Sequence, residues 1–255
     1  MLAELLELAP SGVEEVDVAG GIVEYAVYGA PGELPEIPEL RAAAGPALVE
    51  VRSEEIADDW PDRWRGFHRP LVLDGRLTVR PPWEPPGGTA IEIVIDPGRA
   101  FGTGAHATTR LCLELLLGLD AGGDFLDLGC GSGVLAIAAA RLGYAPVLAL
   151  DNDPAAISAS AENARVNGVE LEVRRLDLRE QPVPAARTAA ANLIGPLLVH
   201  LAGALREPPA RLIASGLLVE EAAGVAGAFG ARGMALAEQR SDGGWSALLL
   251  VRARG

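Results

Sequence analysis

The feature that most constrains the fold is a short apolar strand that breaks into closely spaced glycines and continues as a helix. Residues 125–128 (Phe-Leu-Asp-Leu) are typical of a buried strand, glycines follow at 129, 131 and 133, and an Ala/Leu-rich segment extends to Gly143. Such glycines let the main chain turn with φ > 0 and let a ligand approach it, while a helix start presents unpaired N–H groups. A second apolar strand, 146–150, ends at Asp151. This order predicts a βαβ nucleotide site in which Asp151 accepts ribose hydroxyls.

The spacing of the glycines distinguishes two kinds of nucleotide site. A dinucleotide fingerprint is G-x-G-x-x-G, whereas this chain has G-x-G-x-G over residues 129–133, with Val134 where the last glycine of the fingerprint would fall. The spacing therefore disfavours a dinucleotide oxidoreductase. A structural turn without a ligand is disfavoured too, because strand, turn, helix, second strand and terminal Asp151 follow one another in order.

Composition restricts the class of protein. The 255 residues are 49% hydrophobic, which suffices for one large domain and a small one. The first residues lack the basic region of a signal peptide, and no apolar run is long enough to cross a bilayer, so we expect a soluble cytoplasmic protein without a membrane partner. Neither the two cysteines nor the three histidines show disulfide or metal-ligand spacing, and no metal is expected.

The charge of the chain bears on its partners. All 21 basic residues are arginine, and the formal net charge is −14. Direct binding to nucleic acid requires a positive surface, so we expect none. An acidic protein favours a basic partner, although solubility alone also explains an acidic surface.

The chain divides into three parts by pattern. Residues 1–57 include strands with apolar alternation at 12–18 and 22–28 and are expected to form a small α+β domain. Residues 58–88 combine tryptophans, a hairpin with Asp74-Gly75 at its turn and a Pro/Gly-rich end, which predicts a linker with a hairpin. From 89 to 255 strands and helices alternate, which predicts a doubly wound, mostly parallel α/β sheet.

Three segments together resemble the ribosomal protein L11 methyltransferase family. Residues 97–109 (Pro-Gly-Arg-Ala-Phe-Gly-Thr-Gly-Ala-His-Ala-Thr-Thr) match that family's pattern P-G-x-A-F-G-T-G-x-H-x-T-T, and the other two segments are the glycine turn at 126–133 and residues 191–195 (Ala-Asn-Leu-Ile-Gly). The tryptophans at 60, 64 and 83 resemble the family's link between domains, while the first fifty residues match weakly. The resemblance implies the seven-stranded sheet of class I methyltransferases, with residues 1–57 as a substrate-recognition domain.

The resemblance also implies an activity. A monomeric enzyme would transfer methyl groups from S-adenosylmethionine to lysine ε-amines, and also to the N-terminal α-amine, of the basic large-subunit ribosomal protein L11. A class I methyltransferase for another protein lysine or for a small molecule shares every feature of the nucleotide site and stays an alternative. A glutamine-methylating enzyme is less favoured, because that group resembles Asn-Pro-Pro-Tyr where this chain has Asn-Leu-Ile-Gly at 192–195. A binding module without catalysis is a further alternative.

Carried onto this chain, the resemblance implies that Thr109, Gly129, Gly131, Asp151 and Asn192 bind S-adenosylmethionine. Asn192 is also expected to be the catalytic residue, because its amide can donate and accept beside the incoming amine. It ends a strand at the carboxyl edge, where ligands of open α/β sheets bind. Simpler roles stay open: Thr109 as a helix cap and Asn192 as a turn former.

Three neighbouring polar residues have weaker claims to a role. His106 is equally consistent with a loop-stabilising hydrogen bond and with a ligand contact. Asp153 is expected to cap a helix that begins at Pro154. Asp177, after the third strand of the sheet, either meets an adenine edge or is an ordinary solvated acid, and the second interpretation is favoured.

Overall fold

The chain forms two compact units, Met1–Trp64 and Arg65–Gly255. The computed structural model describes residues 14–18, 22–26, 38, 40, 50–51, 68–97 and 106–252. In the smaller unit, β1 (Glu14–Val18) and β2 (Ile22–Ala26) pair as antiparallel strands. These confirm the two strands predicted from alternation. The domain boundaries at residues 57 and 88 stay a prediction.

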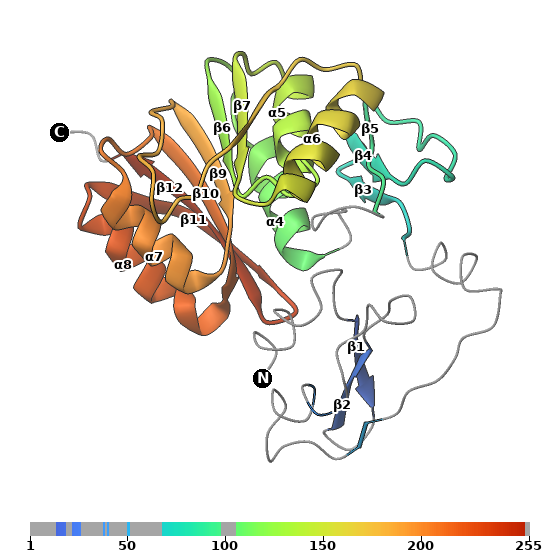
Figure 1. The fold of residues 1–255 in the computed structure, drawn as a ribbon, viewed down its shortest axis with the longest axis horizontal. Helices are drawn as coiled ribbons and strands as arrows, with labels where there is room; N and C mark the ends of the chain where they lie inside the picture. The colour runs from blue at the N-terminus through green and yellow to red at the C-terminus, as the bar shows by residue number, and fades with distance from the viewer. Residues whose placement is uncertain are drawn as a thin grey trace. The chain divides into compact units, whose positions relative to one another are not determined.

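The larger unit is built around one seven-stranded sheet with helices on both faces (Figure 1). The elements that form this layer structure are α4 (Ala107–Leu117), β6 (Phe125–Leu128), α5 (Val134–Leu142), β7 (Val147–Asp151), α6 (Pro154–Val166), β8 (Glu172–Arg175), β9 (Thr188–Asn192), α7 (Gly195–Ala204), β10 (Arg211–Leu218), the 3-10 turn η2 (Val219–Glu221), α8 (Ala222–Gly230), β11 (Met234–Asp242) and β12 (Trp245–Arg252). No helix in the described part of the chain is long and apolar enough to span a membrane.

The order of the strands is β11-β12-β10-β9-β6-β7-β8. Neighbouring strands are parallel except where β12 pairs with β10 and with β11. This confirms the doubly wound, mostly parallel α/β sheet. The chain leaves β6 toward β7 on one side and later returns to β9 on the other, so β6 and β9 form the switch point at which ligands of such sheets bind.

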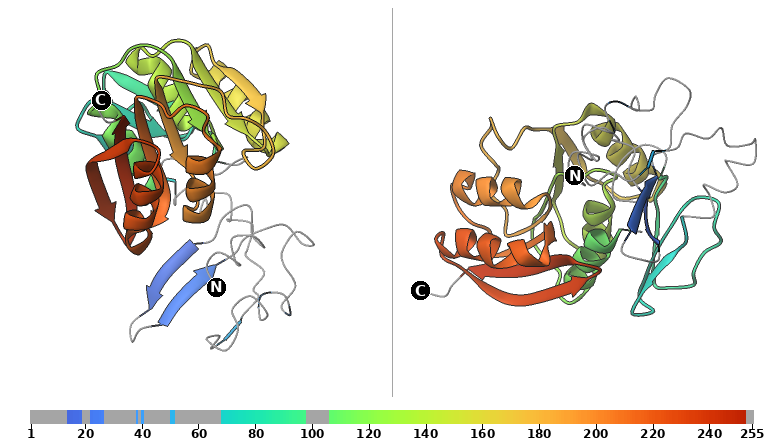
Figure 2. Two further views of the ribbon diagram at one scale, coloured as in Figure 1. Left: turned by 90° about the vertical axis from the view of Figure 1, so that its left-hand side faces the viewer. Right: turned by 90° about the horizontal axis from the view of Figure 1, so that it is seen from below.

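The two faces of the sheet bury different cores, and Figure 2 shows the helices that cover them. Residues of α4 and α5 pack on the face that includes Phe125, whereas residues of α7 and α8 pack on the face that includes Leu126 and Leu128. β6 is therefore buried at every position, as expected for a central parallel strand covered on both sides. The carboxyl end of β6 is thus held rigidly between two helix layers.

A second, three-stranded sheet precedes α4. It contains β3 (Leu71–Leu73), β4 (Leu77–Arg80) and β5 (Ile91–Val94), in the order β3-β4-β5, with β4 parallel to β5. The predicted hairpin is present, and Asp74 and Gly75 both have positive φ at its turn. Because β4 pairs with β5 and buries its side chains in the core shared with α4 and α5, the hairpin belongs structurally to the larger unit.

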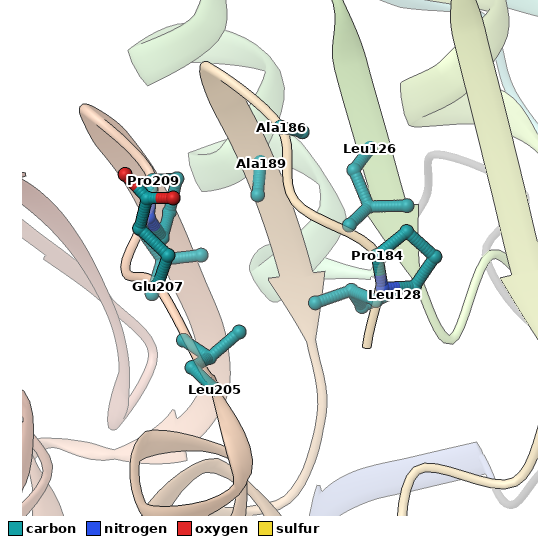
Figure 3. A pocket seen from close by; sticks show the side chains of 9 residues that line it. Leu126, Leu128, Pro184, Ala186, Ala189, Leu205, Glu207 and Pro209 are labelled. Carbon is teal, nitrogen blue, oxygen red and sulfur yellow. The ribbon is translucent and has the colours of Figure 1, made fainter. Parts of the chain in front are cut away.

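One apolar cavity lies on the face covered by α7 and α8, where residues 176–187 join β8 to β9 without a helix (Figure 3). Its lining consists of Leu126, Leu128, Pro184, Ala186, Ala189, Leu205, Glu207, Pro209 and Leu212. Apart from Glu207, which pairs with Arg252, the lining side chains are apolar. The cavity therefore lacks the converging polar groups that a nucleotide site needs.

Candidate active site

The glycine turn after β6 has the backbone that the sequence predicts. Gly129, Gly131 and Gly133 have φ values of 73°, 52° and 81°, all left-handed. The N–H groups of Gly129 and Cys130 donate to the carbonyl oxygen of Leu150 at 2.8 and 3.0 Å, which fastens the turn to the end of β7. Glycine is the residue that adopts these conformations without strain, so the three glycines are needed for the turn itself.

Asp151 is fastened to this turn through both oxygens of its carboxylate. Its Oδ2 accepts from Gly131 N–H at 2.9 Å, and its Oδ1 accepts from Asp153 N–H at 3.0 Å. Each carboxylate oxygen has a second lone pair, so hydroxyl groups of a ligand can bind beside these contacts. Asp153 caps α6 by accepting from Ala155 N–H at 2.8 Å, and this confirms the cap predicted for it.

Thr109 and Asn192 lie together on the other side of the turn. Thr109 is buried in the first turn of α4, and its Oγ1 accepts from Asn192 Nδ2 at 3.3 Å. Leu128 and Ala191 are partners in the β6–β9 register, so Gly129 and Asn192 follow at the same carboxyl edge. An ideal Cβ on Gly129 would lie 2.3 Å from Leu193 Cδ2. The structure therefore brings all five sequence-predicted residues to one sheet edge.

His106 begins α4 and links it to the carboxyl-terminal hairpin. Its Nδ1 lies 2.8 Å from Thr108 Oγ1, and its ring meets that of Trp245 edge to face, with centroids 5.0 Å apart. Burial lowers the pKa of His106 below its usual value, which favours the neutral imidazole. An ion pair between Arg110 and Asp242 joins the same two elements. His106 thus caps α4 and contacts the hairpin; a contact with its own loop concerns residues outside the described part of the chain and stays a prediction.

Trp245 lies at the same sheet edge as the candidate site, where sequence reasoning did not place it. It begins β12 opposite Leu218 of β10, and its partner His106 lies one helical turn from Thr109. The sequence motifs end at residue 195, fifty positions earlier, and Trp245 reaches this edge only because β12 runs antiparallel to β10. No local pattern predicts that residue 245 lies near the start of α4. The one usable signal is an aromatic residue directly after two glycines at the tip of a hairpin.

Asp127 was also missed as a functional candidate, although it lies within the glycine motif. Its side chain is 1% exposed, and Oδ2 accepts from Ala136 N–H at 3.1 Å. Burial raises the pKa of Asp127 to about 7; the hydrogen bond from Ala136 opposes this, and the negative charge of Asp151 adds to it. The carboxyl group therefore titrates near neutral pH directly beneath the turn.

Asn163 of α6 and Asn167, which caps the carboxyl end of that helix, connect the glycine turn to β5. Asn163 Nδ2 donates to Ser132 O at 2.9 Å, and its Oδ1 accepts from Asp96 N–H at 3.4 Å. Asn167 accepts from Val94 N–H at 2.8 Å and donates to Val94 O at 2.7 Å. The start of the motif at 97–109 is thereby fixed relative to the glycine turn. Residues 98–105 of that motif, and tryptophans 60 and 64, lie outside the described residues.

Asp177 makes local hydrogen bonds after β8, and the choice between a solvated acid and an adenine contact stays a prediction. Its Oδ1 accepts from Arg179 N–H at 2.9 Å, and its own N–H donates to Gln181 Oε1 at 3.1 Å. These bonds form a local turn after β8. Among the described residues, no group of His, Cys, Asp and Glu side chains is arranged to hold a metal ion.

Comparison with known proteins gives a consistent result. The model of the family described as ribosomal protein L11 methyltransferase (PrmA) matches residues 37–253. A ribosomal protein L11 methyltransferase of Geobacter metallireducens is 42% identical, over 82% of this chain and 70% of that protein. One of Symbiobacterium thermophilum is 36% identical, over 98% of this chain and 85% of that protein.

A solved structure agrees with the sequence relatives. A ribosomal protein L11 methylase from Lactobacillus delbrueckii subsp. bulgaricus has a TM-score of 0.62 and 27% identity, and the match covers 73% of this chain and 100% of that chain. Together with the seven-stranded sheet and the glycine turn, these matches identify the chain as a member of the ribosomal protein L11 methyltransferase family.

Proposed function

We propose that this enzyme transfers methyl groups from S-adenosylmethionine to lysine ε-amines, and to the N-terminal α-amine, of ribosomal protein L11. The observation that carries the proposal is that two groups of residues lie together at the carboxyl edge of the seven-stranded sheet. Gly129, Gly131 and Asp151 lie on one side of it, and the Thr109–Asn192 pair lies on the other. We place the enzyme in the cytoplasm as a monomer, without direct contact to nucleic acid.

The residues present fit S-adenosylmethionine. Three left-handed glycines leave the main chain without a side chain at positions 129, 131 and 133, and the Asp151 carboxylate is oriented beside Gly131 by two N–H donors. Ribose hydroxyls are the groups that such a carboxylate binds after the second strand of a nucleotide-binding βαβ unit. When bound, the cofactor supplies an electrophilic methyl group on a sulfonium.

Asn192 is suited to orient the acceptor amine. Its Nδ2 is engaged by Thr109 Oγ1, so Oδ1 is the atom that can accept from an incoming N–H. Holding a lysine amine of pKa about 10.4 neutral near pH 7.4 costs about 4 kcal/mol. An amine that loses its proton to water before it enters the site needs no strong base in the protein. The enzyme's contribution is then alignment of the amine for in-line attack.

The proposal is tested by incubating the full-length protein with labelled S-adenosylmethionine and purified ribosomal protein L11. Label should enter L11, and mass mapping should place it on lysines and on the N-terminus. An L11 variant whose mapped lysines are changed to arginine is the matched control and should lose that part of the label. Label in another protein of a ribosomal extract but not in L11 would refute the substrate assignment. Binding of cofactor without transfer would support the non-catalytic alternative.

Asn192→Ala and Thr109→Val distinguish the role of Asn192, which orients the amine, from that of Thr109, which holds the amide of Asn192. Asn192→Ala is expected to lower kcat about 100-fold, within the range for a lost positioning group. Thr109→Val removes only the hydroxyl that holds the amide and should have a smaller effect on kcat. If both variants turn over at the wild-type rate, Asn192 does not orient the amine.

A further inference from the structure

Exposed apolar side chains gather beside the proposed active site. In the described part of the chain, the exposed large hydrophobic residues include Ile194 (59% exposed), Val199, Leu218 and Val219. All four come from two segments, one that follows β9 and one that begins with the last residue of β10. The others, Val72, Val166 and Leu236, lie singly on separate elements. Scattered apolar residues need no explanation, whereas a contiguous group indicates an interaction surface.

Contacts show that the two segments are neighbours. Leu193 N–H donates to Ser215 O at 2.8 Å, and an ideal Cβ on Gly195 would lie 2.7 Å from Glu221 Oε1. Glu221 Oε2 in turn accepts from Leu218 N–H at 2.8 Å. Val199 lies one helical turn after Gly195 and so on the same face of α7. The two segments therefore adjoin at Glu221, and we call their four exposed apolar residues the acceptor patch.

The two segments that form the acceptor patch carry two glutamates and no arginine or lysine. The glutamates are Glu220 and Glu221, and Glu220 is exposed. Residues 193–204 and 216–230 contain neither lysine nor arginine, and His200 is their one basic side chain. An apolar surface that carries carboxylates and no competing cation is complementary to a lysine side chain, because its methylene stem packs on apolar groups while its ammonium stays near a carboxylate.

The acceptor patch is continuous with the site where the acceptor amine must enter. It begins two residues after Asn192, and Leu218 is paired across the sheet with Trp245. Trp245 contacts His106 at the start of α4, the helix whose Thr109 holds Asn192. A substrate segment bound on the acceptor patch would therefore pass beside Asn192, where the acceptor amine is proposed to react.

We propose that the acceptor patch binds a lysine-bearing segment of ribosomal protein L11 next to the lysine that is methylated. This inference rests on the proposed function, since it assigns the docking surface of the same substrate. It predicts that the patch contributes to the affinity for L11 and leaves the affinity for cofactor unchanged, because none of the five residues expected to bind the cofactor belongs to the patch.

The test compares two surface variants with a matched control. Ile194→Ser combined with Val219→Ser removes the centre of the acceptor patch, and Val166→Ser removes a comparably exposed side chain (50%) at the far end of α6. Affinity for L11 is measured by calorimetry in the presence of S-adenosylhomocysteine, and KM and kcat by labelled transfer. We expect the double variant to weaken L11 binding and raise KM about tenfold, with kcat, cofactor affinity and the control unchanged.

A second variant tests the charge. Glu220→Gln should raise KM for L11 a few-fold at low salt, and the difference from wild type should shrink as salt rises. Wild-type affinity and KM in the Ile194/Val219 double variant would overturn the inference while leaving the methyltransferase proposal intact. A wild-type protein that neither binds nor methylates L11 would refute the proposed function, and the docking assignment with it.

Two other occupants would give different results. If residues 1–64 of this chain cover the acceptor patch, the double variant should lower the melting temperature without changing the affinity for L11. If a second copy covers it, sedimentation should show a dimer in the wild type and a monomer in the variant. Either result would overturn the assignment of the acceptor patch to L11.

Discussion

Replacing Gly216 with alanine is expected to displace the active-site end of β9 and to destabilise the larger unit. Gly216 lies at the bulge of β10, between Ser215 and Leu217, with φ of 84°. A Cβ at this position would lie 2.6 Å from the carbonyl oxygen of Leu193 and 2.9 Å from its nitrogen. Both obstacles are main-chain atoms, so no side-chain rotation can relieve the contact.

The magnitude follows from two contributions. A left-handed conformation costs a non-glycine residue about 1–2 kcal/mol, and overpacking a close-packed site costs about 1–3 kcal/mol. The free energy of unfolding should therefore fall by about 2–5 kcal/mol. Relief of the contact requires Leu193 to move, and the adjacent Asn192 moves with it, away from Thr109 Oγ1. The affinity for S-adenosylmethionine should fall as a consequence.

Urea denaturation followed by circular dichroism measures the first effect, and calorimetric titration with S-adenosylmethionine measures the second. Gly224→Ala in α8 is the control, because a Cβ there meets nothing within 4 Å and alanine is favoured over glycine in a helix by up to about 1 kcal/mol. If Gly216→Ala unfolds within about 0.5 kcal/mol of the wild type, the range of an ordinary surface substitution, the packing argument is refuted.

Three further predictions concern the cofactor site, pH and the two units. Asp151→Ala should weaken S-adenosylmethionine binding by about 2–3 kcal/mol in calorimetry, whereas Asp153→Ala, which removes a helix cap, should cost about 1 kcal/mol of stability without changing affinity; equal affinities would contradict the ribose role of Asp151. The pKa of Asp127 is raised by burial to about 7 in the folded state, above an unfolded value of about 4, so its contribution to stability is fully present below about pH 4 and is lost as the pH rises through about 7. Asp127→Asn should abolish that loss, and parallel pH profiles of the two proteins in urea melts between about pH 4 and 8 would show the reasoning to be wrong. A chain that begins at Arg65 keeps the core residues of β4 and β5 and should bind S-adenosylmethionine but methylate L11 more slowly; the full rate in labelled transfer would exclude a recognition role for residues 1–64.

Short-range signals allowed much of the fold and site to be predicted. The glycine turn, the strand that ends at Asp151 and the cap at Asp153 are each decided by a few adjacent residues, because left-handed backbone and helix starts have strong local preferences. Thr109 and Asn192 are far apart in sequence, but both close a motif at the edge where parallel strands end. Their hydrogen bond is a consequence of topology that the alternation of strands and helices already implied.

Long-range packing explains what the sequence did not indicate. Trp245 reaches the site by the antiparallel return of β12, and nothing near residue 245 encodes its contact with His106. The hairpin at 71–80 looks like part of a linker because proline and glycine follow it, yet parallel pairing with β5 buries Leu77 and Val79 in the large core. The raised pKa of Asp127 depends on complete burial by two helix layers, which a motif does not reveal.

Asn163 and Asn167, at the carboxyl-terminal end of α6, have a consequence for how the glycine turn and the motif at 97–109 move. Val94 presents its N–H and carbonyl on the side of β5 away from β4, and the amide of Asn167 occupies both, as a neighbouring strand would. The open edge of β5 is thereby closed to pairing by another chain at this point. Four residues earlier, within α6, Asn163 donates to Ser132 of the glycine turn and accepts from the N–H of Asp96, the residue before Pro97. These two amides therefore couple segments more than thirty positions apart, and we expect the glycine turn and the start of the 97–109 motif to move together.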